Sequence, residues 1–212
     1  MKDIVIICAG GFGVEALAFI RSLNEQARKE EREAPYRVLG FLDDNADTLK
    51  GKNIDYPILG SISDWTPKGG ERYVLGASGP AAKEKLASML KARGCEFETI
   101  IAPWSVVAPS AVIGEGCLIS AYRIASGVTL GRFVNAAGSM LCAGARIGDY
   151  STVTGFSVVE NATVGRRVFV GSHAVVPDGV TVGDDVTISA GSIVMNDLPD
   201  GAKVFGCPAR EF

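Results

Sequence analysis

The chain is poor in the residues that build metal centres and cross-linked folds. It has one histidine in 212 residues, and its five cysteines are odd in number and form no CxxC pair. These features argue against a zinc site or a disulfide framework and indicate reduced thiols. There is no apolar run of about 18 residues and no basic cluster, and the net charge is −3. We therefore expect a cytoplasmic protein with no metal, no nucleic-acid partner and no membrane partner.

A six-residue repeat dominates the second half of the chain. An aliphatic residue returns every six positions, with five-residue steps from Ala136 to Leu141 and from Val153 to Val158. Neither a helix nor an alternating strand has this period, whereas a parallel β-helix does. The predicted inward residues are Val106, Val112, Leu118, Ile124, Leu130, Ala136, Leu141, Ile147, Val153, Val158, Val164, Val170, Val176, Val182, Ile188 and Val194.

The first half opens with the pattern of a nucleotide-binding βαβ unit. An apolar run at residues 4–8 predicts a buried strand, and apolar residues at helical spacing follow at residues 14–20. Between them lie Gly10, Gly11, Phe12 and Gly13, while Cys8 takes the place of the first glycine of a GxGxxG motif. The turn predicts either a phosphate-binding loop before a helix N-terminus or a plain tight turn.

A second predicted strand, residues 36–42, ends in two carboxylates. Asp43 and Asp44 stand where a Rossmann-like unit contacts the ribose or base of a nucleotide. The alternative is a solvated loop or a helix cap. The predicted fold class is α/β plus all-β, with a small Rossmann-like domain over residues 1–100 and a parallel β-helix over residues 101–212.

In this order the two halves resemble the NeuD/PglD-like sugar acyltransferases. The resemblance covers nearly the whole chain and is carried by residues 8–13, 40–44, 190–194 and 204–209. It implies a left-handed β-helix, a homotrimer, acetyl-coenzyme A as co-substrate and a nucleotide-linked amino sugar as partner. It also implies that Gly10 to Gly13 approach the phosphates and sugar, that Asp43 and Asp44 contact the base or ribose, and that the acyl-donor groove is lined by Glu160, Ser172 and Ala190.

The chain departs from this family at the catalytic base. The family places a histidine and an acidic residue four and three positions before an Ile-Gly pair, and here Ala143 and Gly144 occupy those positions. Two residues are candidate replacements. His173 lies on another edge of the predicted coil, so it acts across a trimer interface or is an interface histidine. Glu160 lies one coil after Ala143 and either binds the acceptor or is a turn residue.

The leading hypothesis is transfer of an acetyl group to the amine of a nucleotide-linked amino sugar. An amine needs a base less than a hydroxyl does, which favours N-acetylation over O-acetylation of a sugar such as sialic acid. The alternative is a non-catalytic relative that binds nucleotide sugar or coenzyme A. Arg166 and Arg167 either meet phosphates of coenzyme A or form a salt-bridged turn.

Overall fold

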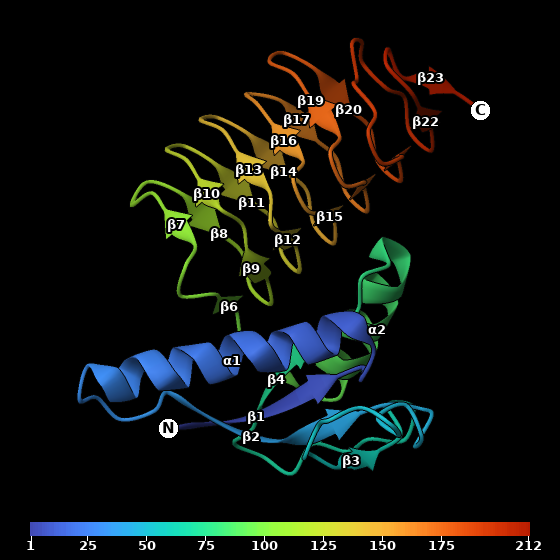
Figure 1. The fold of residues 1–212 in the computed structure, drawn as a ribbon. Helices are drawn as coiled ribbons and strands as arrows, with labels where there is room; N and C mark the ends of the chain where they lie inside the picture. The colour runs from blue at the N-terminus through green and yellow to red at the C-terminus, as the bar shows by residue number, and fades with distance from the viewer.

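The computed structural model describes all 212 residues and has two parts, a small α/β unit and a long β-helix (Figure 1). The α/β unit is a five-stranded, fully parallel sheet in the order β3-β2-β1-β4-β5. Helix α1 (Gly11–Lys29) follows β1, and α2 (Pro80–Ala92) follows β4. The strands are β1 (Lys2–Ile7), β2 (Tyr36–Leu42), β3 (Ile58–Gly60), β4 (Arg72–Leu75) and β5 (Glu96–Phe97).

The two helices cover opposite faces of this sheet because side chains alternate along a buried strand. Ile4 and Ile6 of β1 pack in the cluster that includes α1, whereas Val5 and Ile7 pack in the cluster that includes α2. Neither helix has the length and apolar character that crossing a bilayer requires.

The β-helix is built from three parallel sheets, to which each coil contributes one short strand. The first contains β6 (Ile100–Ile101), β9 (Leu118–Ser120), β12 (Asn135–Ala137), β15 (Thr152–Val153), β18 (Phe169–Val170), β21 (Thr187–Ile188), β22 (Lys203–Phe205) and the antiparallel β23 (Arg210–Glu211). The second contains β7 (Val106–Val107), β10 (Arg123–Ile124), β13 (Met140–Leu141), β16 (Val158–Val159) and β19 (Val175–Val176). The third contains β8 (Val112–Ile113), β11 (Thr129–Leu130), β14 (Arg146–Ile147), β17 (Thr163–Val164) and β20 (Thr181–Val182).

The predicted aliphatic ladder is right along most of its length and one residue out of register at four positions. Val106 and Val112 are 63% and 60% exposed, and Val107 and Ile113 pack on the core in their place. Likewise Ile119 and Val159 enter the core instead of Leu118 and Val158. At all four positions two aliphatic residues are adjacent, so the pattern alone does not decide which one points inward.

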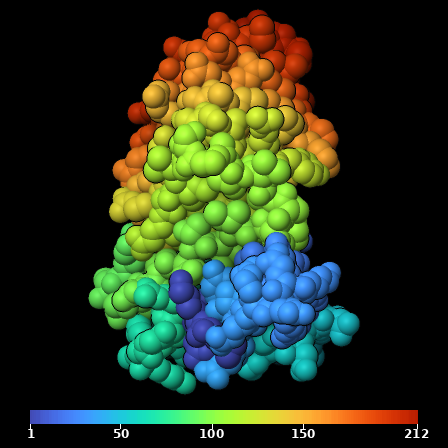
Figure 2. All heavy atoms as spheres, turned by 90° about the vertical axis from the view of Figure 1, so that its left-hand side faces the viewer, coloured from blue at the N-terminus to red at the C-terminus, as the bar shows by residue number.

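The coils stack directly on the α/β unit and give an elongated molecule (Figure 2). Leu118 points out of its coil into the α1 cluster, and Phe133 and Tyr150 point into the α2 cluster. The rings of Phe133 and Tyr150 stack with their centroids 5.4 Å apart. Side-chain hydrogen bonds also cross this junction: the Asn135 amide donates to Ala77 O at 2.8 Å, and the Thr152 hydroxyl donates to Ser78 O at 2.8 Å.

A buried lysine of α2 completes the junction. Lys83 is fully buried, and its Nζ donates to Phe133 O at 3.0 Å and to Ser151 O at 2.9 Å. No carboxylate pairs with it. Burial away from water lowers the pKa of the Lys83 side chain from 10.5 to about 7, because the charged form loses its hydration.

This depressed pKa predicts a pH-dependent stability. Between pH 7 and 10.5 the unfolded chain holds a proton on Lys83 that the folded chain has lost, so a rise in pH favours the folded state. We expect the free energy of unfolding to rise from pH 7 to pH 8.5 by up to about 1.4 kcal/mol per pH unit. Urea denaturation should show this contribution absent in Lys83→Met and retained in Lys85→Met, which alters an exposed lysine of the same helix. Equal slopes in both variants would contradict this prediction.

Candidate functional site

The glycine-rich turn after β1 brings α1 very close to the sheet and leaves its own outer side open. A Cβ at Gly13 would lie 1.9 Å from Cys8 O, and one at Gly76 of the neighbouring strand end would lie 2.4 Å from the Gly13 Cα. Gly10 and Gly11, by contrast, have no atom within 4 Å of an added Cβ. The turn thus packs tightly on the sheet side and presents backbone to solvent on the other.

Cys8 adopts the conformation that the missing first glycine of the motif would supply. Its φ is 68°, in the left-handed region. Gly10 precedes α1 without any side-chain cap, and no acidic residue lies in the first turn of the helix. The first N–H groups of α1 therefore remain free to bind an anion.

The two predicted carboxylates hold the surrounding loops together. Asp43 accepts hydrogen bonds from Ala9 N at 2.8 Å, Asn45 N at 3.0 Å and the Thr48 hydroxyl at 2.9 Å. Asp44 accepts from the hydroxyl of Ser61, which lowers the pKa of its carboxyl, and from Ser63 N. Both carboxylates therefore organise the loops around them, and their contact with the ribose or base of a nucleotide stays a prediction.

One cation at this turn, Lys52, could not be predicted from the sequence. The Nζ of Lys52 donates to Ala9 O at 3.0 Å, although the two residues are 43 positions apart. Lys52 lies in the irregular segment between β2 and β3, outside any motif or periodic pattern. It adds positive charge beside the open N-terminus of α1.

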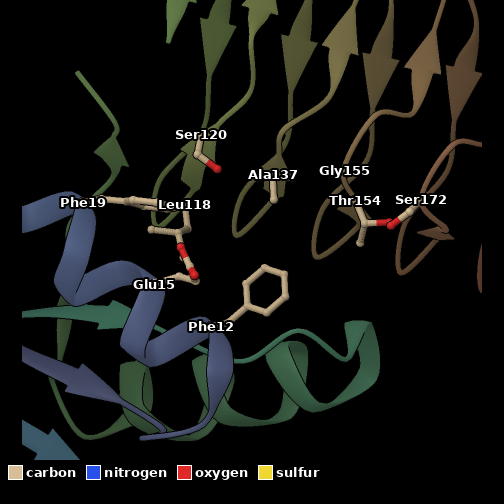
Figure 3. A pocket seen from close by; sticks show the side chains of 9 residues that line it. All are labelled: Phe12, Glu15, Phe19, Leu118, Ser120, Ala137, Thr154, Gly155 and Ser172. Atoms are coloured by element: carbon tan, nitrogen blue, oxygen red, sulfur yellow. The ribbon is translucent and has the colours of Figure 1, made fainter. Parts of the chain in front are cut away.

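A cavity of about 340 Å³ lies between α1 and the β-helix (Figure 3). Three residues of α1 line it, Phe12, Glu15 and Phe19. The β-helix contributes Leu118, Ser120, Ala137, Thr154, Gly155 and Ser172. The cavity thus adjoins the glycine-rich turn through Phe12 and extends along successive coils of the first sheet, and Glu15 is its one ionisable side chain.

His173 stands beside this cavity on a corner of the β-helix. Its ring stacks on Phe156 with centroids 5.1 Å apart, and Phe156 in turn lies 5.9 Å from Tyr122. The residues just before Phe156 and His173 are Gly155 and Ser172, which line the cavity. On the following coil, Ala190 stacks over Gly171.

Ala143 lies on a different corner of the same protomer. It borders a shallow hollow with Arg123, Met140 and Cys142. Glu160 follows on the next coil, since strands on this part of the helix pair at a spacing of 17 residues, as in Arg146↔Thr163. The Glu160 carboxylate accepts a hydrogen bond from Asp178 N at 3.0 Å. Within one protomer, Glu160 is therefore not on the corner that carries Ser172 and Ala190.

Arg166 and Arg167 form the salt-bridged turn that was one of their two predicted roles. Arg166 lies 2.9 Å from Glu84 of α2, and Arg167 pairs with Asp185 at 2.6 Å and with Glu84 at 3.2 Å. The two ion pairs with Glu84 tie α2 to the β-helix.

The architecture defines a class of protein, a Rossmann-like domain joined to a left-handed β-helix of hexapeptide repeats. Residues 161–195 match a family model described as the hexapeptide repeat of succinyl-transferase. No curated protein matches the chain in sequence.

Solved structures match the chain from end to end. The acetyltransferase domain of PglB from Neisseria gonorrhoeae is 22% identical with a TM-score of 0.81, and each chain is covered completely. A histidine-to-asparagine mutant of perosamine N-acetyltransferase from Caulobacter crescentus, in complex with CoA and GDP-perosamine, is 25% identical with a TM-score of 0.82; coverage is 100% of this chain and 97% of that one. WeeI from Acinetobacter baumannii is 23% identical with a TM-score of 0.77 and complete coverage of both chains.

These matches confirm the predicted resemblance to sugar acyltransferases, the predicted fold class and the predicted enzyme class, an acyltransferase. Several of the matched structures hold CoA or acetyl coenzyme A. This agrees with the predicted co-substrate.

The contrast between the turn glycines predicts effects of very different size for one added methyl group. Gly13→Ala places a Cβ against Cys8 O and should lower the free energy of unfolding by about 2 kcal/mol or more, because α1 must move off the sheet. Gly10→Ala meets no atom and should change it by less than about 0.5 kcal/mol. Urea denaturation of both variants beside the unaltered protein tests this. Equal losses of stability would mean that the close approach at Gly13 is unimportant.

Proposed function

We propose that the chain transfers an acetyl group from acetyl-coenzyme A to the amine of a nucleotide-linked amino sugar. The observation that carries this proposal is the cavity shared by α1 and the β-helix, directly beside the glycine-rich turn. A sugar in that cavity has a nucleotide-binding element at one end and the repeat coils along its side. The perosamine N-acetyltransferase of C. crescentus, which has this fold, binds GDP-perosamine and CoA.

The two parts of the chain divide the binding between them. Residues 1–100 hold the nucleotide: the open side of Gly10 and Gly11 and the free N–H groups of α1 face the diphosphate, with Lys52 adding positive charge. Asp43 and Asp44 shape the loops beside the base or ribose. Residues 101–212 bind the acyl donor along a groove between coils of neighbouring protomers in a homotrimer. The free thiols fit the cytoplasm as the compartment.

Catalysis then depends chiefly on positioning. The amine nitrogen attacks the thioester carbon, the C–N bond forms, and the C–S bond breaks as coenzyme A leaves. A backbone N–H of the β-helix stabilises the oxyanion. A neutral amine is already a nucleophile, so a chain with Ala143 in place of the usual histidine keeps the binding and orientation that supply much of the rate.

The reaction is tested by mixing the purified protein with acetyl-coenzyme A and GDP-, dTDP- or UDP-linked 4-amino-4,6-dideoxyhexoses. Mass spectrometry should detect the N-acetylated sugar nucleotide, a readout that the exposed thiol of Cys207 does not disturb. We expect turnover by the unaltered chain and a rise in kcat of about 10²-fold or more in Ala143→His, which restores a base. Ala143→Ser is the matched control and should leave kcat nearly unchanged.

The absence of the usual base favours a second candidate, a relative that binds both ligands without turning them over. In the C. crescentus enzyme, a histidine-to-alanine mutant is found in complex with CoA and GDP-perosamine. If calorimetry shows binding of both ligands and no product forms until Ala143→His is made, the chain is a binding protein. Loss of turnover in His173→Ala, with ligand binding intact, would instead assign the chemistry to His173 of a neighbouring protomer.

A further inference from the structure

Glu15 is the one charged side chain that reaches the cavity. It rises from α1 toward the β-helix and ends beside Leu118, with its carboxylate at the cavity wall (Figure 3). The other lining residues are apolar or carry neutral hydroxyls, as in Ser120, Thr154 and Ser172. Any positive group on a molecule in this cavity therefore has Glu15 as its single charged partner.

The Glu15 carboxylate is also unengaged within the protein. It forms no hydrogen bond and no ion pair, whereas Asp43, Asp44 and Glu160 each accept hydrogen bonds from neighbouring loops. The hydroxyls across the cavity are partly committed: Ser172 donates to Thr154 at 3.2 Å, and Thr154 donates to Val170 O at 2.8 Å. Glu15 thus retains its full capacity to accept hydrogen bonds from a ligand.

The position of Glu15 along α1 indicates that its carboxylate faces the sugar of the ligand and not the phosphates. Glu15 lies four residues beyond Gly11, about 6 Å along the helix axis. A diphosphate at the turn would therefore place the far side of its attached sugar near the carboxylate. Glu15 is itself exposed, and the rings of Phe12 and Phe19 line the cavity beside it. A sugar bound there would displace water from the carboxylate, which strengthens its attraction to an ammonium group.

We propose that Glu15 binds the reacting amine of the acceptor and takes up a proton from it during acyl transfer. The inference rests on the proposed function. An amine that arrives as ammonium gives its first proton to a Glu15 oxygen, which releases it to water before the attack, so that Glu15 is again a carboxylate. The neutral nitrogen attacks the thioester carbon, and the positive charge that then forms on nitrogen faces the carboxylate. The second proton goes to the departing thiolate, so the products are the amide, coenzyme A as free thiol and one proton released to water.

The test compares an amine with the matching alcohol. GDP-perosamine and GDP-D-rhamnose differ only in an amino group against a hydroxyl at C4, and calorimetry gives the affinity of each for the unaltered protein, Glu15→Gln and Glu25→Gln. Glu25 is an exposed glutamate further along α1 and serves as the control. We expect Glu15→Gln to lose about 10- to 100-fold in affinity for GDP-perosamine and less than about twofold for GDP-D-rhamnose. The dTDP pair of 4-amino-4,6-dideoxyglucose and 6-deoxyglucose serves if GDP sugars do not bind.

Kinetics complete the test. In Glu15→Gln we expect kcat for acetyl transfer to fall at least tenfold, with affinity for coenzyme A unchanged, while Glu25→Gln matches the unaltered chain. Full kcat and unchanged amine selectivity in Glu15→Gln would overturn the role of Glu15 and leave acetyl transfer standing. Selective amine binding through Glu15 without any product would overturn acetyl transfer and leave the amine site standing. An unaltered protein that binds neither sugar pair would overturn both.

Discussion

Each strand of the β-helix is only two or three residues long, so one side chain per strand must enter the coil and its neighbour must leave it. This constraint determines which residues point outward, and these outward residues form the contacts with the α/β unit. Because Ile119 fills the core, Leu118 turns toward α1 and forms a wall of the cavity. Phe133 and Tyr150 lie in the turns between strands, and their side chains pack against α2. Packing of the coil interior thus determines where the α/β unit attaches.

The same constraint explains how far the sequence predicts the fold. A strict period of six has one physical solution, and the strand–glycine turn–helix opening has few, so both halves and their order follow from the pattern. The register fails only where two aliphatic residues are adjacent, as at Val106 and Val107, because burial of either is equally favourable until the neighbouring coil is placed. The turn glycines are predictable as a group, but the division between Gly13, which is packed, and Gly10, which is open, depends on the position of Cys8 O.

Much of the candidate site lay beyond sequence reasoning for a related reason. Lys52 and Glu15 are distinguished by what surrounds them in space, and nothing in their local pattern sets them apart from other surface charges. Asp43 and Asp44 had a motif, yet the hydrogen bonds that occupy them come from residues up to 34 positions away. A motif indicates which side chains lie at the same edge of a sheet. Whether these side chains can still accept hydrogen bonds from a ligand depends on the neighbouring loops, which have no periodic pattern. The placement of Ala143 and His173 on separate corners, by contrast, could be counted from the repeat alone.

The predicted replacement of the family's histidine by Ala143 is easier to explain when the charge near the acceptor is considered. A base on the β-helix and a carboxylate on α1 have related effects, because either one stabilises the transition state in which the attacking nitrogen loses a proton. A hydroxyl acceptor carries no positive charge before attack, so a nearby carboxylate does not hold it by charge attraction. An amine gains from the carboxylate both before and during attack. In the proposed mechanism the negative charge of Glu15 at the cavity therefore favours an amine as acceptor and compensates for the small side chain of Ala143. In the proposed mechanism the α/β unit therefore holds the nucleotide and also supplies, from its first helix, the one charge at the reacting end of the sugar.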